Sequence, residues 1–242
     1  MMLTLFSSRK TLGKSKLLQG MTDVHSHLLP GVDDGVPTCD EALQILERLQ
    51  ELGVSRMYLT PHIMADLPGN EPEKLKKQFD LLQQAWKGQV ELRLAGEYML
   101  DNGFEQQRAW GLMAMAEQHL LVETSYLSSP PGFLNMLYDL SLDGYVPVLA
   151  HPERYTYMEE EDYQMLKGKG YAFQLNLMSL YGVYGRRAAA VSRYLLKGGY
   201  YDYVGSDLHR LHPFDETVAH LALTRSEVNQ LRVLMENNHS LW

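Results

Sequence analysis

The chain has 242 residues, a length that allows one large domain or two small ones. Its formal net charge of −8 argues against a general nucleic-acid-binding protein, because such a protein presents a basic face to the phosphates. The single cysteine, Cys39, excludes an intramolecular disulfide and fits a reducing compartment, and no apolar run approaches the roughly 18 residues that span a membrane. We therefore expect a cytoplasmic protein without a membrane span.

The N-terminal residues 1–19 are predicted to lie outside the folded domain. Residues 1–6 are apolar, and basic residues follow them between positions 9 and 16. A secretory signal has the opposite order, with its charge before a longer apolar region. We expect residues 1–19 to form a poorly ordered extension. Residues 20–242 are expected to form a single domain, because no change of composition marks a boundary within them.

The first predicted strand, residues 22–27, carries His25 and His27 near its end. Alternate residues of a strand point to one face, so the two imidazoles project together and can chelate one metal ion. Asp33 and Asp34 follow in a loop that contains Pro and Gly and can fold back towards this pair. The alternative is a polar strand end with two solvated histidines, and so short a motif does not decide between them.

Helices and strands alternate along the rest of the chain. Capping boxes at 38–41 and 224–227 begin two helices, and glycines at 53 and 198–199 end two. Strands are predicted at 22–27, 54–60, 90–98, 119–124, 145–151, 171–176 and 202–206. Helices are predicted at 38–52, 71–87, 130–143, 160–167, 186–197 and 224–236. Residues 102–117 are rich in Met and Gln, and we assign no element to them.

This alternation predicts an α/β fold with a parallel sheet. An open doubly wound sheet is one possibility, and such a sheet binds its ligands at a single switch point. Here candidate ligands lie at the ends of at least six strands, and only a barrel brings that many strand ends to one site. We therefore predict a TIM-like barrel of roughly seven strands.

Polar side chains gather at the predicted strand ends. They are His25, His27, His62, Glu97, Glu123, His151, Asp207 and His209. Imidazoles and carboxylates without thiolates suit manganese, iron or zinc, and carboxylates that bridge cations allow a site of two or three ions. Clustered ions bind phosphate oxygens and lower the pKa of a bound water, which favours attack on phosphorus. The remaining histidines are expected to be structural or exposed, namely His119, His212, His220 and His239.

Six short motifs together resemble a known superfamily. They are Asp23-Val-His-Ser-His27, Thr60-Pro-His62, Gly96-Glu97, Val122-Glu123, His151-Pro-Glu-Arg154 and Gly205-Ser-Asp-Leu-His209. In this order they resemble the polymerase and histidinol phosphatase (PHP) superfamily. The run from His25 to Gly35, taken with His151-Pro-Glu-Arg154, closely resembles the bacterial manganese-dependent protein-tyrosine phosphatases of capsule and exopolysaccharide clusters. The resemblance covers residues 20–213.

The resemblance implies a distorted (β/α)7 barrel, the PHP fold, with a trinuclear manganese site. It assigns a first ion to His25, His27, Glu97 and Asp207. It assigns a second ion to Glu97, Glu123 and His151, with Glu97 bridging the two. It places Asp34, His62 and His209 near a third ion.

Arg154 and Asp34 are the catalytic candidates that the resemblance implies. Arg154 matches a family arginine that binds the substrate phosphate, and its planar guanidinium suits two phosphate oxygens. A salt bridge at the rim of the barrel is the alternative role for Arg154. The family carries a second phosphate-binding arginine several residues beyond the last histidine, where this chain reads His209-Arg-Leu-His-Pro-Phe214. Arg210 and His212 are the candidate replacements, and the absence of any replacement is the other alternative.

The candidate donors and the family resemblance are consistent with three functions. The first is a metal-dependent phosphatase that removes phosphate from tyrosine on a cognate bacterial tyrosine kinase controlling capsule or exopolysaccharide synthesis. The second is a small-molecule phosphatase of the histidinol-phosphate type, and the third is a metal-stabilised regulatory binding protein with little turnover. A cysteine-based phosphatase is excluded, because that mechanism needs Cys-x5-Arg and the residue six positions after Cys39 is Ile45.

Overall fold

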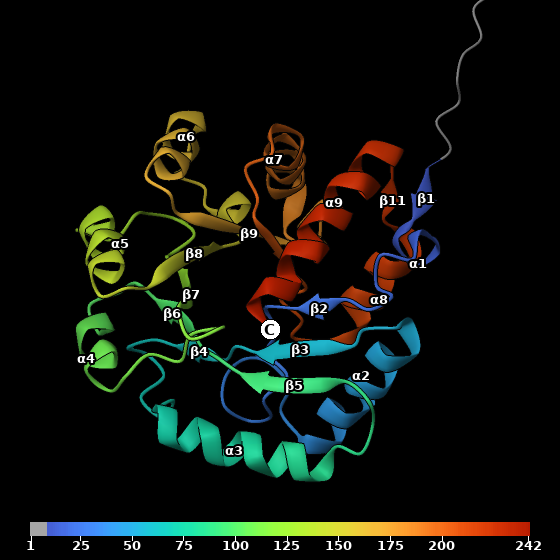
Figure 1. Cartoon of the computed structure of the whole chain (residues 1–242), viewed down its shortest axis with the longest axis horizontal. Helices are drawn as coiled ribbons and strands as arrows, with labels where there is room; N and C mark the ends of the chain where they lie inside the picture. The colour runs from blue at the N-terminus through green and yellow to red at the C-terminus, as the bar shows by residue number, and fades with distance from the viewer. Residues whose placement is uncertain (1–8) are drawn as a thin grey trace, which may run out of the picture.

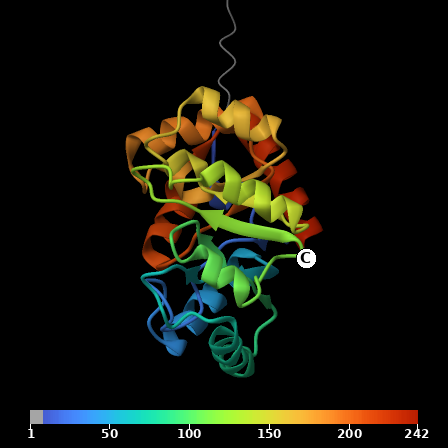
Figure 2. The ribbon, with the colours of Figure 1, turned by 90° about the vertical axis from the view of Figure 1, so that its left-hand side faces the viewer.

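A computed structural model describes residues 9–242 (Figure 1). The barrel strands are β2 (Thr22–Asp23), β3 (Arg56–Leu59), β4 (His62–Ile63), β5 (Glu91–Leu94), β6 (Glu97–Met99), β7 (His119–Glu123), β8 (Val146–Ala150), β9 (Ala172–Asn176) and β10 (Tyr203–Gly205). The helices around them are α2 (Cys39–Leu52), α3 (Pro72–Ala85), α4 (Phe104–Ala109), α5 (Phe133–Leu142), α6 (Glu160–Gly168), α7 (Gly185–Gly198), α8 (Leu211–His220) and α9 (Arg225–Asn238). Figure 2 looks onto the side of the molecule that carries α4, α5 and α6.

Parallel strands close into a ring. One run has the order β10-β9-β8-β7-β6-β4, and a second has the order β2-β3-β5. The runs join at one seam through a parallel bridge between Ser26 and Leu208. At the other seam the amide of Ala95 donates to Leu59 and the amide of Glu97 donates to Pro61. With β3 and β4 counted as one interrupted strand, and β5 and β6 as another, this is the predicted distorted (β/α)7 barrel.

The predicted strand at 90–98 is divided into β5 and β6. The division falls at Gly96, where an added Cβ would lie 2.5 Å from the Cδ1 of Ile63 and 2.8 Å from the ring of Tyr98. The amide of Gly96 donates to Met113 outside the barrel ladder, so the strand bends at this point. The predicted strand at 54–60 likewise gives way at Pro61, which has no amide hydrogen for the ladder. The two breaks therefore fall directly before His62 and Glu97, which begin β4 and β6.

The predicted helix signals are confirmed except at 38–41, where one half of the predicted capping box is present. The Thr38 side chain accepts a hydrogen bond from the amide of Glu41, and Gly53 ends α2 with a φ of +92°. Thr224 and Glu227 form a reciprocal capping box at the start of α9. The sequence-based prediction missed α4 in the Met- and Gln-rich stretch, and it missed α8.

Two sets of apolar side chains are buried. The larger set packs the outward faces of the strands against the helices. The smaller set fills the barrel interior and includes Tyr58, Met115, Leu121 and Val148. Leu241, beyond α9, belongs to this interior set and is fully buried. The C-terminus therefore returns to the barrel and closes its amino end.

The described part of the predicted N-terminal extension is built into the fold. Strand β1 (Lys10–Thr11) pairs antiparallel with β11 (Ala222–Leu223), and the short helix α1 (Leu12–Ser15) follows it. Leu12, Leu17 and Leu18 are buried. For these residues the expectation of poor order is corrected, because three leucines and a backbone pairing anchor them. Residues 1–8 lie outside the described residues. Within residues 9–242 no helix combines the length and the hydropathy needed to span a membrane.

Candidate metal centre

His25 and His27 meet two carboxylates at the carboxyl end of the barrel. Their Nε2 atoms lie 3.2 Å apart. Each Nε2 lies 3.2–3.4 Å from Glu97 Oε2 and from Asp207 Oδ1. Ligand atoms about 2.0–2.1 Å from one tetrahedral ion lie about 3.3–3.4 Å apart, so the four donors have the spacing of a metal site. These are the four residues that the family resemblance assigned to a first ion.

Glu97 also takes part in a second group of donors. Its Oε1 lies 3.1 Å from His151 Nε2, and Glu123 Oε2 lies 3.9 Å from the same nitrogen. Glu97 therefore presents Oε2 to the first group and Oε1 to His151. His62 contributes here as well, because its Nδ1 lies 3.0 Å from Glu97 Oε2 and 2.9 Å from Glu123 Oε1. The sequence analysis had placed His62 only near the third ion.

Asp34 reaches the other side of His62. Its Oδ1 lies 3.4 Å from His62 Nε2 and 3.3 Å from His209 Nε2. The imidazoles of His27 and His209 stack with their centroids 3.9 Å apart, so the third group adjoins the first. Asp34, His62 and His209 form the predicted third group. Together with His27 they make a set of four residues with metal-ligand spacing. Asp34 is the exposed member, with 73% of its side-chain surface accessible.

Side chains behind the donors fix the orientation of the imidazoles. The Nδ1 of His27 lies 2.8 Å from Asp33 Oδ2, and the Nδ1 of His25 lies 3.0 Å from Gln174 Oε1. These bonds leave both Nε2 atoms free to bind a cation. Gly35 lets the Asp33 loop approach, because a Cβ at this position would lie 2.6 Å from the Cβ of His27. Sequence reasoning missed Gln174, although a polar amide between Phe173 and Leu175 in a buried strand was a usable signal.

Asp207 presents one oxygen to the donors and the other to the protein. Its Oδ2 accepts hydrogen bonds from Arg154 Nη1 at 2.7 Å and from Asn176 Nδ2 at 2.7 Å, with the Tyr184 hydroxyl at 3.3 Å. Asp207 has a φ of +52° and His151 has a φ of +33°. Backbone strain of this kind persists only where the surrounding structure enforces it, and it concentrates at functional sites.

Several buried polar atoms of the cluster make no well-directed hydrogen bond within the described residues, even where a neighbouring imidazole or carboxylate atom lies within 3.3 Å. They are His62 Nδ1, Glu97 Oε2, His151 Nδ1 and both carboxylate oxygens of Glu123. Burial, and then the charge of Glu97, raise the pKa of Glu123, which shows that its ionised form is poorly stabilised by the protein alone. A cation between these oxygens would supply the missing partner. The donor set thus fits divalent metal ions.

Carboxylates set the protonation states of the cluster. Burial would lower the pKa of His25 and His62, but the charge of Glu97 outweighs it and raises both, so a metal ion must displace protons from these imidazoles. Burial would raise the pKa of Glu97, but the positive charges of His25 and His62 outweigh it and hold this pKa well below its usual value. Burial, together with the adjacent charge of Arg154, lowers the pKa of His151 to about 4. At neutral pH Glu97 is therefore a carboxylate and His151 is a neutral imidazole, the forms that coordinate metals.

A cavity of about 290 Å³ opens above the donors. It is lined by Asp34, His62, Tyr126, Arg154, Met178, Val183, Tyr184, Asp207, His209, Arg210 and Pro213. The Arg154 guanidinium lies between two aromatic faces, 4.3 Å from the Tyr126 ring centre and 4.0 Å from that of Tyr184. These cation–π contacts and the Asp207 bond hold its planar group at the cavity wall. The two tyrosines carry no motif, and the sequence analysis missed them.

The His-Pro-Glu-Arg motif contains a further positioning residue that the sequence analysis did not single out. Glu153 is fully buried, and burial raises its pKa to about 7. Its Oε2 accepts a hydrogen bond from the Tyr201 hydroxyl at 2.9 Å, and its Oε1 accepts one from the Asn176 amide at 3.1 Å. These bonds tie the 3₁₀ turn η1 (Pro152–Arg154) to the barrel, between His151 and Arg154.

Arg210 lines the cavity but is engaged with backbone. Its Nη1 donates to the carbonyl oxygens of Asp34, Gly35 and His209. The other candidate replacement, His212, is exposed in the first turn of α8 and does not line the cavity. The histidines predicted to be structural or exposed lie outside the donor groups, at His119, His212, His220 and His239.

A parallel barrel with histidine and carboxylate donors at its carboxyl end defines a PHP-type protein with a cluster able to bind metal ions. The chain belongs to the family described as capsular polysaccharide synthesis, CpsB/CapC, whose profile matches residues 21–240. The resemblance found in the sequence motifs is therefore confirmed.

Three similar proteins illustrate this membership. The tyrosine-protein phosphatase YwqE of Bacillus subtilis is 29% identical over 205 residues, which cover 79% of this chain and 78% of YwqE. The putative tyrosine-protein phosphatase CapC of Staphylococcus aureus is 26% identical over 204 residues, with coverage of 79% and 78%. A solved structure from work on YwqE of B. subtilis and CpsB of Streptococcus pneumoniae, described as unique metal-dependent tyrosine phosphatases, is 26% identical with a TM-score of 0.77. That match covers 91% of this chain and 94% of the solved chain.

Proposed function

We propose that this chain is a metal-dependent phosphatase that hydrolyses phosphotyrosine on a bacterial tyrosine kinase controlling capsule or exopolysaccharide synthesis. The observation that carries the proposal is the group of carboxylate and imidazole atoms with metal-ligand spacing, most of them buried, below a cavity with an arginine on its wall. The names of the relatives YwqE and CapC support the substrate class. A cytoplasmic location is part of the proposal, because Cys39 is the single cysteine of the chain.

The proposed cofactor is Mn²⁺, in two or three ions, with iron or zinc as alternatives that the donor types also suit. The first group of donors would be His25, His27, Glu97 and Asp207. The second would be Glu97, Glu123 and His151, with His62 Nδ1 facing it, and the third would be Asp34, His62 and His209. When bound, such ions polarise phosphate oxygens and make a bound water acidic enough to supply a nucleophile at neutral pH.

Arg154 is the residue proposed to bind the substrate phosphate. Its Nη1 is bound to Asp207, and its planar fork faces the cavity between Tyr126 and Tyr184. An arginine fixed in this way binds non-bridging phosphate oxygens without first having to order its own side chain. For Arg210 we propose the role of positioning the Asp34 loop, because its Nη1 already donates to that loop.

Asp34 is proposed as the charged acceptor at the cavity mouth. Hydrogen bonds from His209 and His62 hold the pKa of this carboxyl well below its usual value, so it stays ionised at neutral pH. The Asp34 carboxylate can therefore bind a cation or accept a hydrogen bond from a donor that enters from solvent. The leaving group of a phosphotyrosine is a phenolate with a pKa of about 10, so it needs less acid assistance than an alkoxide.

Metal analysis combined with substrate comparison tests this function. Protein purified gently should contain two or three divalent ions per chain and should hydrolyse a phosphotyrosine peptide and p-nitrophenyl phosphate faster than an alkyl phosphate. Preference for a small alkyl phosphate would favour the small-molecule phosphatase instead. Bound metal without detectable turnover of any phosphate ester would favour the regulatory binding protein.

A further inference from the structure

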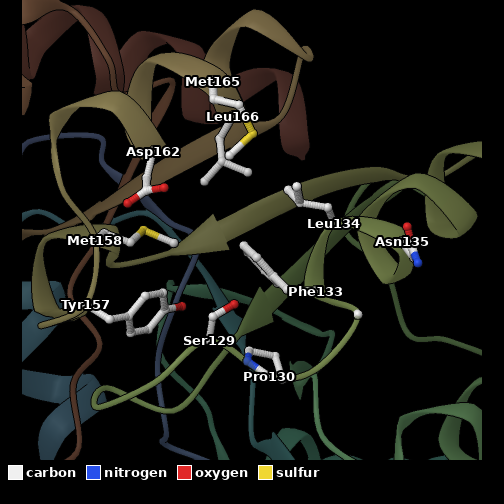
Figure 3. A pocket seen from close by; sticks show the side chains of 11 residues that line it. Ser129, Pro130, Phe133, Leu134, Asn135, Tyr157, Met158, Asp162, Met165 and Leu166 are labelled. Atoms are coloured by element: carbon white, nitrogen blue, oxygen red, sulfur yellow. The ribbon is translucent and has the colours of Figure 1, made fainter.

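A second cavity, larger than the one above the metal donors, shares no lining residue with it. Its volume is about 430 Å³, and it opens between the loop after β7, helix α5 and helix α6. It is lined by Ser129, Pro130, Gly132, Phe133, Leu134, Asn135, Tyr157, Met158, Asp162, Met165 and Leu166. Figure 3 shows Phe133 and Leu166 reaching into the space from opposite walls, with Met158 and Tyr157 on a third side. Its floor is therefore apolar.

The rim of this cavity combines exposed apolar groups with negative charge. Leu134 and Met165 line it and are 38% and 37% exposed, and Leu127 in the adjoining loop is 79% exposed. Asp162 is the acidic residue that lines the cavity, and three glutamates precede it at positions 159–161, where α6 begins. Glu159 and Glu160 line a neighbouring cavity together with Arg187. Among the residues that line the cavity with Asp162 there is no lysine or arginine. The cavity thus suits an apolar side chain with a positive charge beside it.

Stacked aromatic rings connect this cavity to the metal centre. Tyr126 lines the mouth above the metal donors, and Tyr157 lines the apolar cavity. Tyr155 stacks between them, with ring centres 6.2 Å from Tyr126 and 5.8 Å from Tyr157. The ring centres of Tyr126 and Tyr157, one on the wall of each cavity, are therefore at most about 12 Å apart, a distance comparable to three to four extended residues at about 3.3 Å each.

We propose that this cavity docks the substrate polypeptide itself, by taking an apolar side chain three to four residues from the phosphotyrosine, with a lysine or arginine next to it. The inference rests on the proposed phosphatase function. A small phosphate ester bound at Arg154 is too short to fill both sites, whereas an extended polypeptide reaches from one to the other. The cavity therefore discriminates among phosphotyrosine sequences and leaves the chemistry at the metal centre unchanged.

The test compares one small and one large substrate on the same variants. Leu134→Glu and Met165→Glu each place a negative charge on the rim, at side chains exposed enough for the fold to tolerate the change. Leu142→Glu is the matched control, because Leu142 lies on the same helix as Leu134, is 67% exposed and does not line the cavity. The substrates are p-nitrophenyl phosphate and a series of phosphotyrosine peptides. Each peptide carries either Leu or Ser at one position within five residues of the phosphotyrosine, with Lys next to that position.

For wild-type protein we expect a lower KM for peptides with Leu three or four residues from the phosphotyrosine than for the matching Ser peptides. Leu134→Glu and Met165→Glu should raise the KM of the Leu peptides tenfold or more, with kcat nearly unchanged. Turnover of p-nitrophenyl phosphate should stay within twofold of wild type in both variants. Leu142→Glu should behave as wild type with every substrate.

Two results would overturn the inference while leaving the phosphatase function intact. One is equal KM values for Leu and Ser peptides in wild-type protein. The other is an unchanged peptide KM in both rim variants. If those variants also alter a dimer seen by size-exclusion chromatography, the cavity would be assigned to a second copy of the chain. By contrast, wild-type protein with bound metal that hydrolyses neither p-nitrophenyl phosphate nor any phosphotyrosine peptide would refute the phosphatase function itself.

Discussion

The two ends of the barrel are built from opposite kinds of side chain. At the carboxyl end, buried histidines and carboxylates face one another, and several of their polar atoms make no well-directed hydrogen bond within the described residues. At the amino end, Leu241 is fully buried, and the Tyr58 hydroxyl donates to its carbonyl oxygen at 2.6 Å. The Trp242 ring packs edge-on against Tyr58 and lies 4.3 Å from the Arg93 guanidinium carbon. The carboxyl end of the barrel can bind cations, whereas the polar groups named at the amino end already have partners within the protein.

This difference separates function from stability within one domain. Buried charges that the protein does not fully compensate lower the free energy of unfolding. The same charges make a strong binding site for ions. Apolar burial at the amino end contributes to stability without contact with the reacting groups. Substitutions at the carboxyl end should therefore change activity more than folding, and substitutions at the amino end should do the reverse. The predictions below test this separation in order of decreasing effect.

Loss of the metal donors should have the largest effect. His25→Ala removes one of four converging donors, so it should abolish both metal binding and turnover. EDTA should do the same to wild-type protein, and added Mn²⁺ should restore activity. Far-UV circular dichroism should show that the variant remains folded, because the apolar layers do not depend on His25. An aggregated, unfolded variant would make the site structural and would contradict the separation.

A chemical control accompanies the metal experiment. Iodoacetamide should change the activity little, because Cys39 lies at the start of α2, outside the donor groups. Inactivation by this reagent at a rate that matches the modification of Cys39 would contradict a mechanism based on metal ions alone.

Substitution of Arg154 should have the second largest effect. Arg154→Ala should keep the full metal content and lose catalytic efficiency by on the order of 10²-fold or more, as for one lost electrostatic donor. Arg154→Lys should recover little, because lysine has neither the planar fork nor the same stacking between Tyr126 and Tyr184. Steady-state kinetics on an aryl phosphate, with metal analysis and a melting curve for each variant, measures this.

The alternative role for Arg154 is a salt bridge with Asp207 at the rim of the barrel. This role leads to the opposite expectation. It predicts a lower melting temperature with turnover close to that of wild type. Such a result would rule out the phosphate-binding role, and Arg210 would become the next candidate because its side chain also lines the cavity.

A cavity at the amino end should change stability and leave chemistry alone. Leu241→Ala should lower the free energy of unfolding by about 2 kcal/mol, near the small end of the range for buried leucines, because the chain end can relax into the space. Denaturant titration measures the loss, and kcat/KM at a temperature where the variant is folded should match wild type. A large fall in kcat/KM would show that the two ends are coupled.

The smallest expected effect is a pH dependence at the amino end. Burial lowers the pKa of His119 below the usual value of 6.5, and its ring meets the Tyr203 ring edge-on. The folded state therefore favours neutral His119, so its contribution to stability is full above pH 6.5 and falls as the pH drops below that value. His119→Phe should reduce the loss of melting temperature between pH 8 and pH 5.5. An identical pH profile in wild type and variant would refute this assignment.

The sequence by itself predicted the order of the barrel strands and of most helices around them, and it named the candidate metal donors. Helix caps and strand alternation are local patterns, so 38–52, 160–167 and 224–236 were predicted as helices without tertiary information. Polar residues placed at the ends of otherwise apolar strands predicted the site, because parallel strands of a barrel end on one face. The donors named from these positions, from His25 to His209, all lie in the groups with metal-ligand spacing.

Only the tertiary structure decided how these donors share ions and what holds them. His62 turns one nitrogen to Glu97 and the other to Asp34, which its motif could not reveal. Gln174 reaches His25 across the barrel, and Leu241 closes the far end through a contact with Tyr58, 183 residues away in the sequence. Such contacts depend on strand register and on the path of the whole chain. The residues involved repeat no local period, so no pattern within one segment of sequence encodes them.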